Sequence, residues 1–162
     1  MSEKRRVKMT VNGRLHEALV EPRRLLVDFI RHELRLYGTH VGCEQGVCGA
    51  CTILVEGEPI KSCLMLAVQA DGRTLQTVES LAQGEALHPL QEIFRETHAL
   101  QCGYCTPGFL MTGVALGERG IVLEGAALRG ELAGNLCRCT GYQNIVEAME
   151  RYLRQRADAA RT

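Results

Sequence analysis

GCEQGVCGACT, at residues 42–52, is the stretch that decides how the N-terminal half of this chain folds. Its three cysteines have the spacing C-x4-C-x2-C, which is typical of plant-type [2Fe–2S] proteins. The glycines between them allow the positive φ angles and close backbone approach that a loop wrapped around a cluster needs. Backbone amides in such a loop can donate hydrogen bonds to the sulfur atoms, which helps to set the reduction potential. With a fourth cysteine farther along the chain, the predicted ligands of this first set are Cys43, Cys48, Cys51 and Cys63.

A second set of four cysteines lies in the C-terminal half, as C-x2-C at Cys102 and Cys105 and as C-x-C at Cys137 and Cys139. The first of these pairs comes just before a predicted helix that begins at Pro107, and the second comes just before the last predicted helix. Two loops at adjacent helix ends can close around one cluster, and helix N-termini favour negative charge such as that of thiolates. The second set therefore predicts a second [2Fe–2S] cluster.

Structural zinc is the main alternative for both sets, because four cysteines also bind Zn²⁺ in tetrahedral geometry. The plant-type spacing disfavours zinc at the first set. At the second set taken alone zinc stays open, although C-x-C is unusual for a zinc site. A Rieske centre is excluded, because no histidine pairs with a cysteine at short spacing in both halves of the site. The glycine-rich stretch matches neither the G-x-G-x-x-G nor the G-x4-G-K-[ST] pattern of phosphate-binding loops.

The composition narrows the class of protein. The 162 residues suffice for one ordinary domain or two small ones, and the hydrophobic content of 46% is normal for a globular protein. The formal net charge is zero, which points to neither a nucleic-acid nor an acidic-membrane partner. No apolar run reaches the ~20 residues that a transmembrane helix needs, and the basic N-terminus lacks the apolar core of a signal peptide. We therefore predict a cytoplasmic protein, where thiols stay reduced and four disulfides are disfavoured.

Hydrophobic periodicity predicts an α+β chain with two parts. The N-terminal half alternates as strands do, with one helix; the predicted strands are residues 6–11, 15–20, 52–55, 60–66 and 74–78, and the predicted helix is 25–36. The C-terminal half has helical periodicity, with helices expected from Pro89 through residue 94 and over 108–116, 124–132 and 145–153. The polar tail after Arg156 is expected to fray. The predicted domains are 1–78, a sheet domain with one helix, and 79–162, a helical bundle.

Four motifs together resemble one family. They are GCEQGVCGACT (42–52), SCL (62–64), QCGYCTPG (101–108) and GNLCRCTGY (134–142), and they resemble the small iron–sulfur subunit of molybdenum hydroxylases. That family includes carbon monoxide dehydrogenase, aldehyde oxidoreductase, xanthine dehydrogenase and heterocycle hydroxylases. The resemblance spans about residues 7–153 and fills all eight ligand positions. The short gap from Cys51 to Cys63 departs from free plant ferredoxins and agrees with this family.

The resemblance implies a β-grasp [2Fe–2S] ferredoxin domain followed by a four-helix-bundle [2Fe–2S] domain. It also implies a large partner chain with the molybdenum–pterin cofactor and a medium partner chain with FAD, assembled as a dimer of heterotrimers. Electrons would pass from molybdenum through the bundle cluster and the β-grasp cluster towards FAD, with Gln101 and the Cys139 sulfur lying against the pterin. The chain would belong to an oxidoreductase while having no catalytic residue of its own.

Two alternative functions stay open. One is a stand-alone ferredoxin-like electron carrier, although free ferredoxins are usually strongly acidic. The other is an interaction module that structural zinc holds together. The substrate and the terminal acceptor stay open, because the pocket belongs to another chain.

Overall fold

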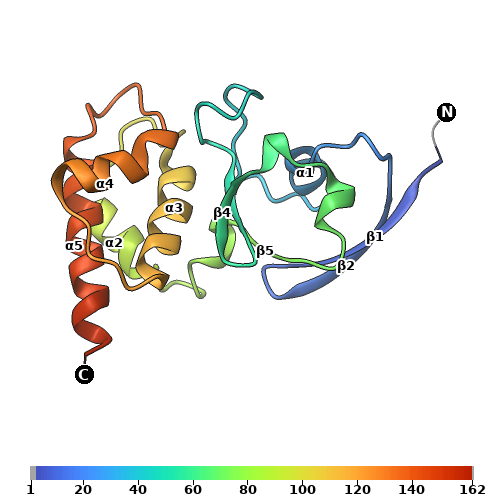
Figure 1. The fold of residues 1–162 in the computed structure, drawn as a ribbon. Coiled ribbons are helices and arrows are strands. Elements are labelled where there is room, and N and C mark those ends of the chain that lie inside the picture. Colours follow the sequence, from blue (N-terminus) through green and yellow to red (C-terminus); the bar gives the residue numbers. More distant parts are fainter. Residues whose placement is uncertain (1–2, 162) are drawn as a thin grey trace.

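A five-stranded mixed sheet forms the N-terminal half of the molecule, in a computed structural model that describes residues 3–161 (Figure 1). The order across the sheet is β2-β1-β5-β3-β4, with β1 and β5 parallel and the other neighbours antiparallel. The strands are β1 (Arg5–Val11), β2 (Arg14–Val20), β3 (Thr52–Val55), β4 (Glu58–Lys61) and β5 (Thr74–Gln76). Asn12 and Gly13 both have positive φ in the β1–β2 turn, as the predicted Asn-Gly hairpin requires.

A short helix crosses this sheet and buries its apolar side against it. It consists of α1 (Leu26–Asp28) and the π-helical turn η1 (Phe29–Glu33), and both Phe29 and Ile30 lie in the core of the sheet half. The helix expected over 25–36 is thus shorter than predicted. Arg35 has a φ of 58°, a left-handed conformation that an α-helix cannot continue through.

Two predicted strands also end early. The segment predicted as a strand over 60–66 leaves the sheet after Lys61, and Cys63 lies on the 3₁₀ turn η2 (Ser62–Leu64). A further 3₁₀ turn, η3 (Ala67–Ala70), precedes β5, and η4 (Val78–Ser80) follows it, so the strand predicted over 74–78 is shorter. The mixed sheet with one helix across it is nevertheless the expected β-grasp arrangement.

Four α-helices form the C-terminal half, as the periodicity predicts. They are α2 (Pro89–Glu96), α3 (Thr106–Glu118), α4 (Gly125–Glu131), which runs into the 3₁₀ turn η5 (Leu132–Gly134), and α5 (Gln143–Ala159). Pro89 occupies the first turn of α2, where its missing N–H is not needed. The expected fraying after Arg156 is wrong, since α5 continues to Ala159 and Arg156 pairs with Glu118 of α3 at 2.9 Å.

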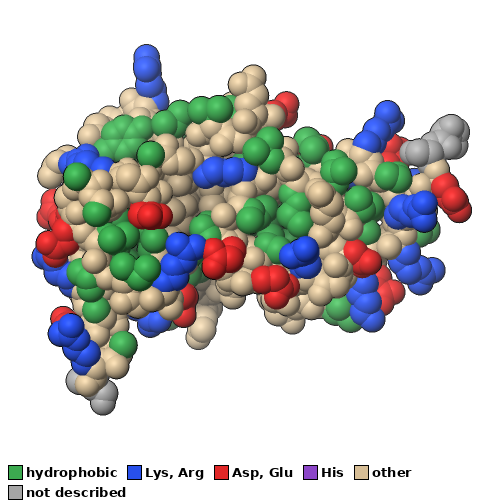
Figure 2. Space-filling model, viewed as in Figure 1, with side chains coloured by type: hydrophobic (Ala, Val, Ile, Leu, Met, Phe, Trp, Pro, Cys, Tyr) green, Lys and Arg blue, Asp and Glu red, His purple; other side chains and the backbone are tan. Residues whose placement is uncertain are grey.

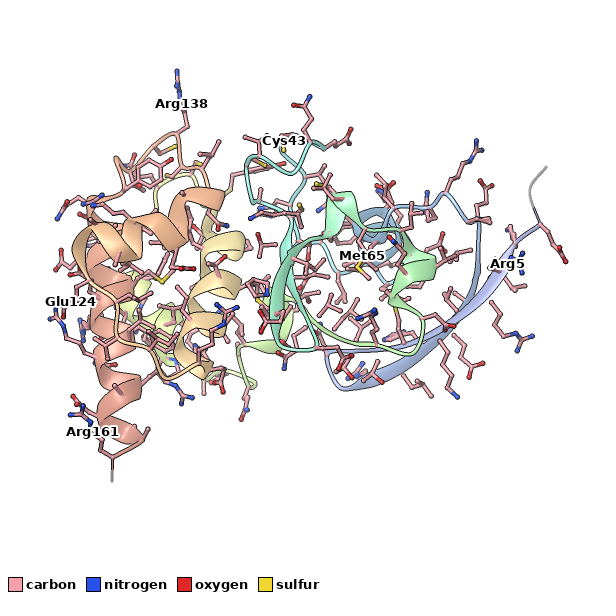
Figure 3. The ribbon with its side chains drawn as sticks, in the orientation of Figure 1. Arg5, Cys43, Met65, Glu124, Arg138 and Arg161 are labelled. Atoms are coloured by element: carbon pink, nitrogen blue, oxygen red, sulfur yellow. The ribbon has the colours of Figure 1, made fainter. Side chains whose placement is uncertain are left out.

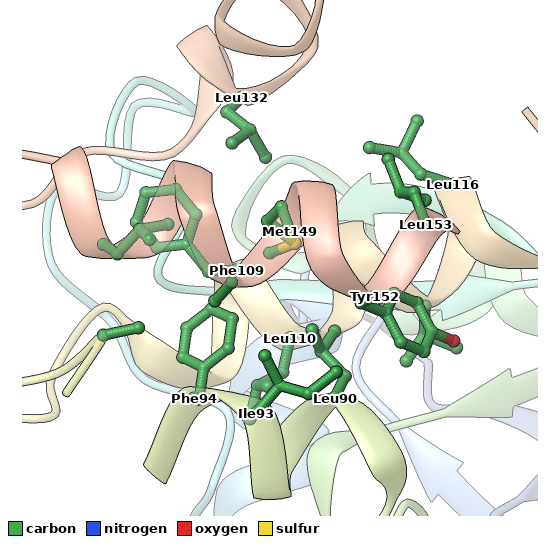
Figure 4. Close-up of a cluster of buried hydrophobic side chains, with 14 of the residues drawn as sticks. Leu90, Ile93, Phe94, Phe109, Leu110, Leu116, Leu132, Met149, Tyr152 and Leu153 are labelled. Carbon is green, nitrogen blue, oxygen red and sulfur yellow. The ribbon is translucent and has the colours of Figure 1, made fainter. Parts of the chain in front are cut away.

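The helical half has its own hydrophobic core. Phe94, Phe109 and Met149 come from α2, α3 and α5 and lie together in it (Figure 4). Helix α3 is buried from Gly108 to Gly117, and a helix that is apolar on all sides must be covered on all sides. The helices cover one side of it and strands β3 and β4 cover the other (Figure 1). Leu54 of β3 reaches across and joins the helical core.

Both signs of charge occur on the face of the molecule that Figure 2 shows. Acidic and basic side chains are interspersed over the face that Figure 2 shows, in keeping with a formal net charge of zero. Arg119, the C-cap residue of α3, pairs with Glu58 of β4 at 2.5 Å, which adds an ion pair between the two halves. None of the helices within residues 3–161 is both long and apolar enough to cross a membrane.

Candidate metal centres

The N-terminal cysteine loop is shaped by backbone that glycine permits. Gly46 and Gly49 have φ of 76° and 72°. Glu44, which directly follows Cys43, also has positive φ. This winding turns backbone amides towards sulfur, because the Cys43 Sγ accepts from the amides of Gln45 and Cys48, each at 3.4 Å. These contacts are the amide-to-sulfur hydrogen bonds that the glycine-rich motif predicts.

The four thiols of this first set meet as two pairs. Cys43 lies close enough to Cys48 for each thiol to affect the ionisation of the other. The same holds for Cys51 and Cys63, which η2 brings back against the start of β3. Cys51 and Cys63 are buried, whereas Cys43 and Cys48 lie partly exposed in the loop. The first set is therefore buried where it adjoins the sheet and partly exposed along the loop.

The ionisation of these thiols follows their surroundings. Hydrogen bonds from the amides of Cys48 and Gln45 lower the pKa of the Cys43 thiol to about 6. Burial, with a smaller contribution from Cys51, raises the pKa of Cys63 to about 11. A coordinated metal deprotonates a thiol outright, so burial of Cys63 does not oppose ligation once the metal arrives.

The second set is built from two loops that end at helices, as predicted. Cys105 is the N-cap residue of α3, and Cys137 and Cys139 lie in the segment between η5 and α5. The Cys139 thiol donates to Cys102 across 3.5 Å, and Cys137 lies close enough to Cys105 to affect its ionisation. Here too the four thiols form two pairs.

The environment of each pair in the second set differs. Cys102 and Cys139 are exposed, whereas Cys105 and Cys137 are partly covered. Burial raises the pKa of Cys105 to about 12. Burial would also raise the pKa of Cys137, but hydrogen bonds outweigh it and lower that pKa; the first of them comes from the Thr140 hydroxyl at 3.1 Å. Cys105 and Cys137 thus lie against the protein, and Cys102 and Cys139 lie on its surface.

Two facing pairs are the arrangement that a two-iron cluster requires, since each iron takes two cysteine thiolates. The soft, all-sulfur donor sets also suit iron–sulfur clusters. The residues present therefore fit [2Fe–2S] clusters.

Gln101 and Cys139 lie on the surface. Gln101 is exposed and immediately precedes Cys102, whose thiol touches that of Cys139. Both residues expected to approach the pterin are thus on the same outward-facing part of the second site. Exposed apolar side chains accompany the two sites: Val47 and Leu64 near the first, and Leu100, Tyr104 and Leu136 near the second.

Several residues of these sites were not predicted from the sequence. Thr140 donates to the Cys137 sulfur, and the Tyr142 hydroxyl accepts from the Cys137 amide at 3.0 Å. Tyr104 stacks on His40 with ring centroids 4.7 Å apart and donates its hydroxyl to the Val41 carbonyl. Thr140 and Tyr142 belong to the motif around the second cysteine pair, which is a usable signal. The contact of Tyr104 with residues 40 and 41 joins distant segments and has no local signal.

Comparison with known proteins agrees with this geometry. A family model described as "2Fe-2S iron-sulfur cluster binding domain" matches residues 9–82, and one described as "[2Fe-2S] binding domain" matches residues 77–150. The fold and the two cysteine sites together define an iron–sulfur protein with a ferredoxin-type domain followed by a helical [2Fe–2S] domain.

The relatives narrow this class. The chain is 55% identical to the 6-hydroxypseudooxynicotine dehydrogenase complex subunit beta of Paenarthrobacter nicotinovorans, over 88% of this chain and 90% of the relative. It is 54% identical to the caffeine dehydrogenase subunit gamma of a Pseudomonas species, over 89% and 88%. A chain of quinoline 2-oxidoreductase from Pseudomonas putida superposes with a TM-score of 0.90 at 49% identity, over 99% and 98%. The chain belongs to the family of small iron–sulfur subunits of molybdenum hydroxylases.

Proposed function

We propose that this chain is the electron-transfer subunit of a heteromeric molybdenum hydroxylase and carries two [2Fe–2S] clusters. The observation that carries the proposal is the division of its eight cysteines into two sets, each of two facing pairs. The ligands of the first cluster are Cys43, Cys48, Cys51 and Cys63, and those of the second are Cys102, Cys105, Cys137 and Cys139. When bound, each cluster takes up and gives up single electrons. The chain does no substrate chemistry itself.

The protein's own groups prepare the two sites for this role. Amides of the loop 43–51 and the Thr140 hydroxyl donate hydrogen bonds to sulfur, which favours the more negative, reduced state of a cluster. Burial of Cys51 and Cys63 keeps water from one side of the first site. The sites are held by separate folds, and the division between them lies at residues 78 and 79, within the overlap of the two matching domains.

The partners follow from the exposed parts of the sites. The large chain with the molybdenum–pterin cofactor docks at Gln101 and Cys139, where the second site faces outward. The medium chain with FAD docks beside the loop 42–51, where Val47 and Leu64 are exposed. Exposed apolar side chains around both sites support contacts with other chains. The complete assembly is a dimer of heterotrimers in the cytoplasm.

The substrate of the complex is a nitrogen heterocycle. Caffeine and quinoline, which appear in the names of two similar proteins, are compounds of this class. Because the pocket belongs to the large chain, oxidation of a panel of heterocycles, aldehydes and carbon monoxide by the purified complex tests the substrate class independently of the electron-transfer role.

Metal analysis of the purified full chain tests the central claim. We expect about four iron and four sulfide per chain and a red-brown colour, as two clusters with four cysteines each require. Zinc in stoichiometric amount without visible absorbance would refute it, because Zn²⁺ is colourless. Purification of the chain from its native host, followed by analysis for molybdenum and flavin, separates a complex subunit from a stand-alone carrier. A carrier would elute alone.

A further inference from the structure

A tyrosine in a strained backbone conformation lies at the base of the second cysteine loop. Tyr142 has a φ of 69°, a left-handed conformation that is uncommon for residues other than glycine and an outlier for a bulky side chain. It follows Gly141, which has a φ of 67°, so two successive left-handed residues turn the chain from the loop into α5. Because glycine would make this turn without strain, the tyrosine points to a role for its side chain.

Tyr142 contacts the loop through two of its polar groups. Its hydroxyl accepts a hydrogen bond from the Cys137 amide at 3.0 Å. Its own amide donates to the hydroxyl oxygen of Thr140 at 3.1 Å. The left-handed turn folds the chain back, so that one residue contacts both ends of the segment 137–140.

These contacts direct a hydrogen-bond donor at a ligand sulfur. A threonine hydroxyl has a single proton, and the Thr140 oxygen already accepts from the Tyr142 amide. That proton therefore stays available for the Cys137 Sγ, which the Thr140 hydroxyl contacts at 3.1 Å. The Thr140 amide donates to the same sulfur at 3.4 Å. Since the Tyr142 hydroxyl fixes the Cys137 backbone, Tyr142 holds both the donor and the acceptor of the hydroxyl-to-sulfur hydrogen bond.

The ring of Tyr142 connects this turn to the helical core. It packs against Phe109 of α3 in edge-to-face geometry, with ring centroids 6.4 Å apart and planes 72° apart. The tip of the loop is exposed in contrast, since Cys139 lies on the surface and Arg138 points away from the molecule at its outer edge (Figure 3). Tyr142 thus fixes an exposed loop to buried side chains.

We propose that Tyr142 is a positioning residue that raises the reduction potential of the cluster in the helical half, and that it acts through the Thr140 hydroxyl. The proposal rests on the proposed function, which supplies that cluster. A hydrogen bond to a ligand sulfur favours the more negative, reduced state and so raises the potential. Without the Tyr142 hydroxyl the turn at residues 137–140 opens, the hydrogen bond from Thr140 to the sulfur lengthens, and the potential falls.

Four variants of the full chain separate this role from a structural one. Tyr142→Phe removes only the hydroxyl and keeps the ring, Thr140→Val removes the donor to sulfur, and the double variant tests whether the two residues act as one unit. Tyr152→Phe is the matched control, because Tyr152 lies in α5 and its buried hydroxyl has no hydrogen-bond partner among the residues that the structure describes. Tyr142→Asn replaces Tyr142→Phe if the latter does not bind its cluster, since asparagine tolerates left-handed backbone.

The experiment is a reductive titration of the full chain with dithionite, in which one electron enters each cluster and the EPR signals of the two clusters are followed. A Cys102→Ser chain identifies the signal of the helical half, and iron content is measured for each variant. We expect the potential of that cluster to fall in Tyr142→Phe, with the same sign as in Thr140→Val and by no more. Tyr142→Phe should add no further shift in the Thr140→Val background. The potential of the sheet-half cluster should not change, and Tyr152→Phe should match the wild type at both clusters.

A wild-type potential in Tyr142→Phe, with full iron content, would overturn the positioning role, because a merely structural tyrosine would change stability alone. A second, equal shift in the Thr140→Val background would overturn the action through Thr140. An upward shift would also overturn it, because the freed Cys137 amide would then donate to sulfur. Loss of this cluster from both Tyr142→Phe and Tyr142→Asn would assign the residue to assembly of the site and not to its potential. Absence of iron–sulfur clusters from the wild-type chain would instead refute the proposed function.

Discussion

Gly108→Ala should destabilise this protein, although the same exchange ordinarily stabilises a helix. Replacing a helical glycine with alanine gains about 0.5–1 kcal/mol, because alanine loses less backbone entropy on folding. Gly108 lies in the first turn of α3, however, and is buried where that helix crosses the loop of the first cysteine set. The added methyl group would stand 2.2 Å from the Gly49 carbonyl oxygen, which is backbone and cannot rotate away.

The loss of stability comes from the backbone shift that the added methyl group requires. Overpacking of this kind costs about 1–3 kcal/mol. The Gly49 oxygen also accepts from the Thr52 hydroxyl at 2.7 Å and from Asn135, and losing one such bond costs about another 1 kcal/mol. After the gain in helix propensity is subtracted, we expect a net loss of about 1–3 kcal/mol. For a chain of this size that lowers the melting temperature by several degrees.

Gly130→Ala in α4 is the matched control, since a Cβ there would meet nothing within 4 Å. It should raise the melting temperature slightly. Loss of cluster makes unfolding irreversible, so the assay is the bleaching of visible absorbance on heating, with all variants run at one scan rate. A Gly108→Ala chain that bleaches at or above the wild-type temperature would show that α3 does not press on the loop as argued.

Three further perturbations test individual contacts. Thr140→Val removes the hydroxyl that donates to Cys137 and should lower the reduction potential of the helical-half cluster in an EPR-monitored titration, whereas Thr140→Ser should not. Burial lowers the pKa of His88, so the folded state favours the neutral imidazole. The protein therefore has its full stability above the unfolded pKa of about 6.5, and it loses stability as the pH falls from that value towards the lower folded pKa. Melting temperatures measured from about pH 5 to 8 should show this fall, and His88→Asn, which keeps a helix-capping side chain, should flatten it. Glu58→Gln should change the free energy of unfolding by less than about 1 kcal/mol in urea, because the Glu58 side chain is largely exposed and that of Arg119 is partly exposed.

The cysteine sets were predictable from the sequence because ligand spacing is local chemistry. The loop that carries Cys43, Cys48 and Cys51 had to be glycine-rich, and the structure indeed gives Gly46 and Gly49 positive φ. The existence of the helices was also predictable, because α2 and α5 are amphipathic and α3 follows Pro107 as one apolar run. The ends of two helical segments were not predictable. Arg35, just after η1, adopts a left-handed conformation, and Arg156 of α5 pairs with Glu118 of α3; neither fact has a periodic signal.

The contact between the two halves was harder to predict, but one signal existed. All four residues of β3, Thr52–Val55, are buried, and a strand with an unbroken buried run is covered on both faces. Ile53 belongs to the core of the sheet half and Leu54 to that of the helical half. The apolar sequence TILV thus indicated this interface. The hydrogen bond from Asn135 to the Gly49 carbonyl, in contrast, joins residues 86 positions apart and leaves no signal in the spacing of the sequence.

The use of backbone rather than long side chains at the centre of this interface fits an electron-transfer role. Two small domains joined only by surface side chains such as Glu58 and Arg119 could tilt against each other, because exposed ion pairs hold position weakly. Tilting would change the distance between the two sites, on which electron transfer depends steeply. Glycines at 49 and 108 let main chain meet main chain, and the buried Asn135 closes the contact with hydrogen bonds that cannot lengthen without leaving polar groups unpaired. The same three residues that keep the two sites at one distance therefore make the halves depend on each other for stability, so that a substitution at any of them should loosen both cysteine loops together.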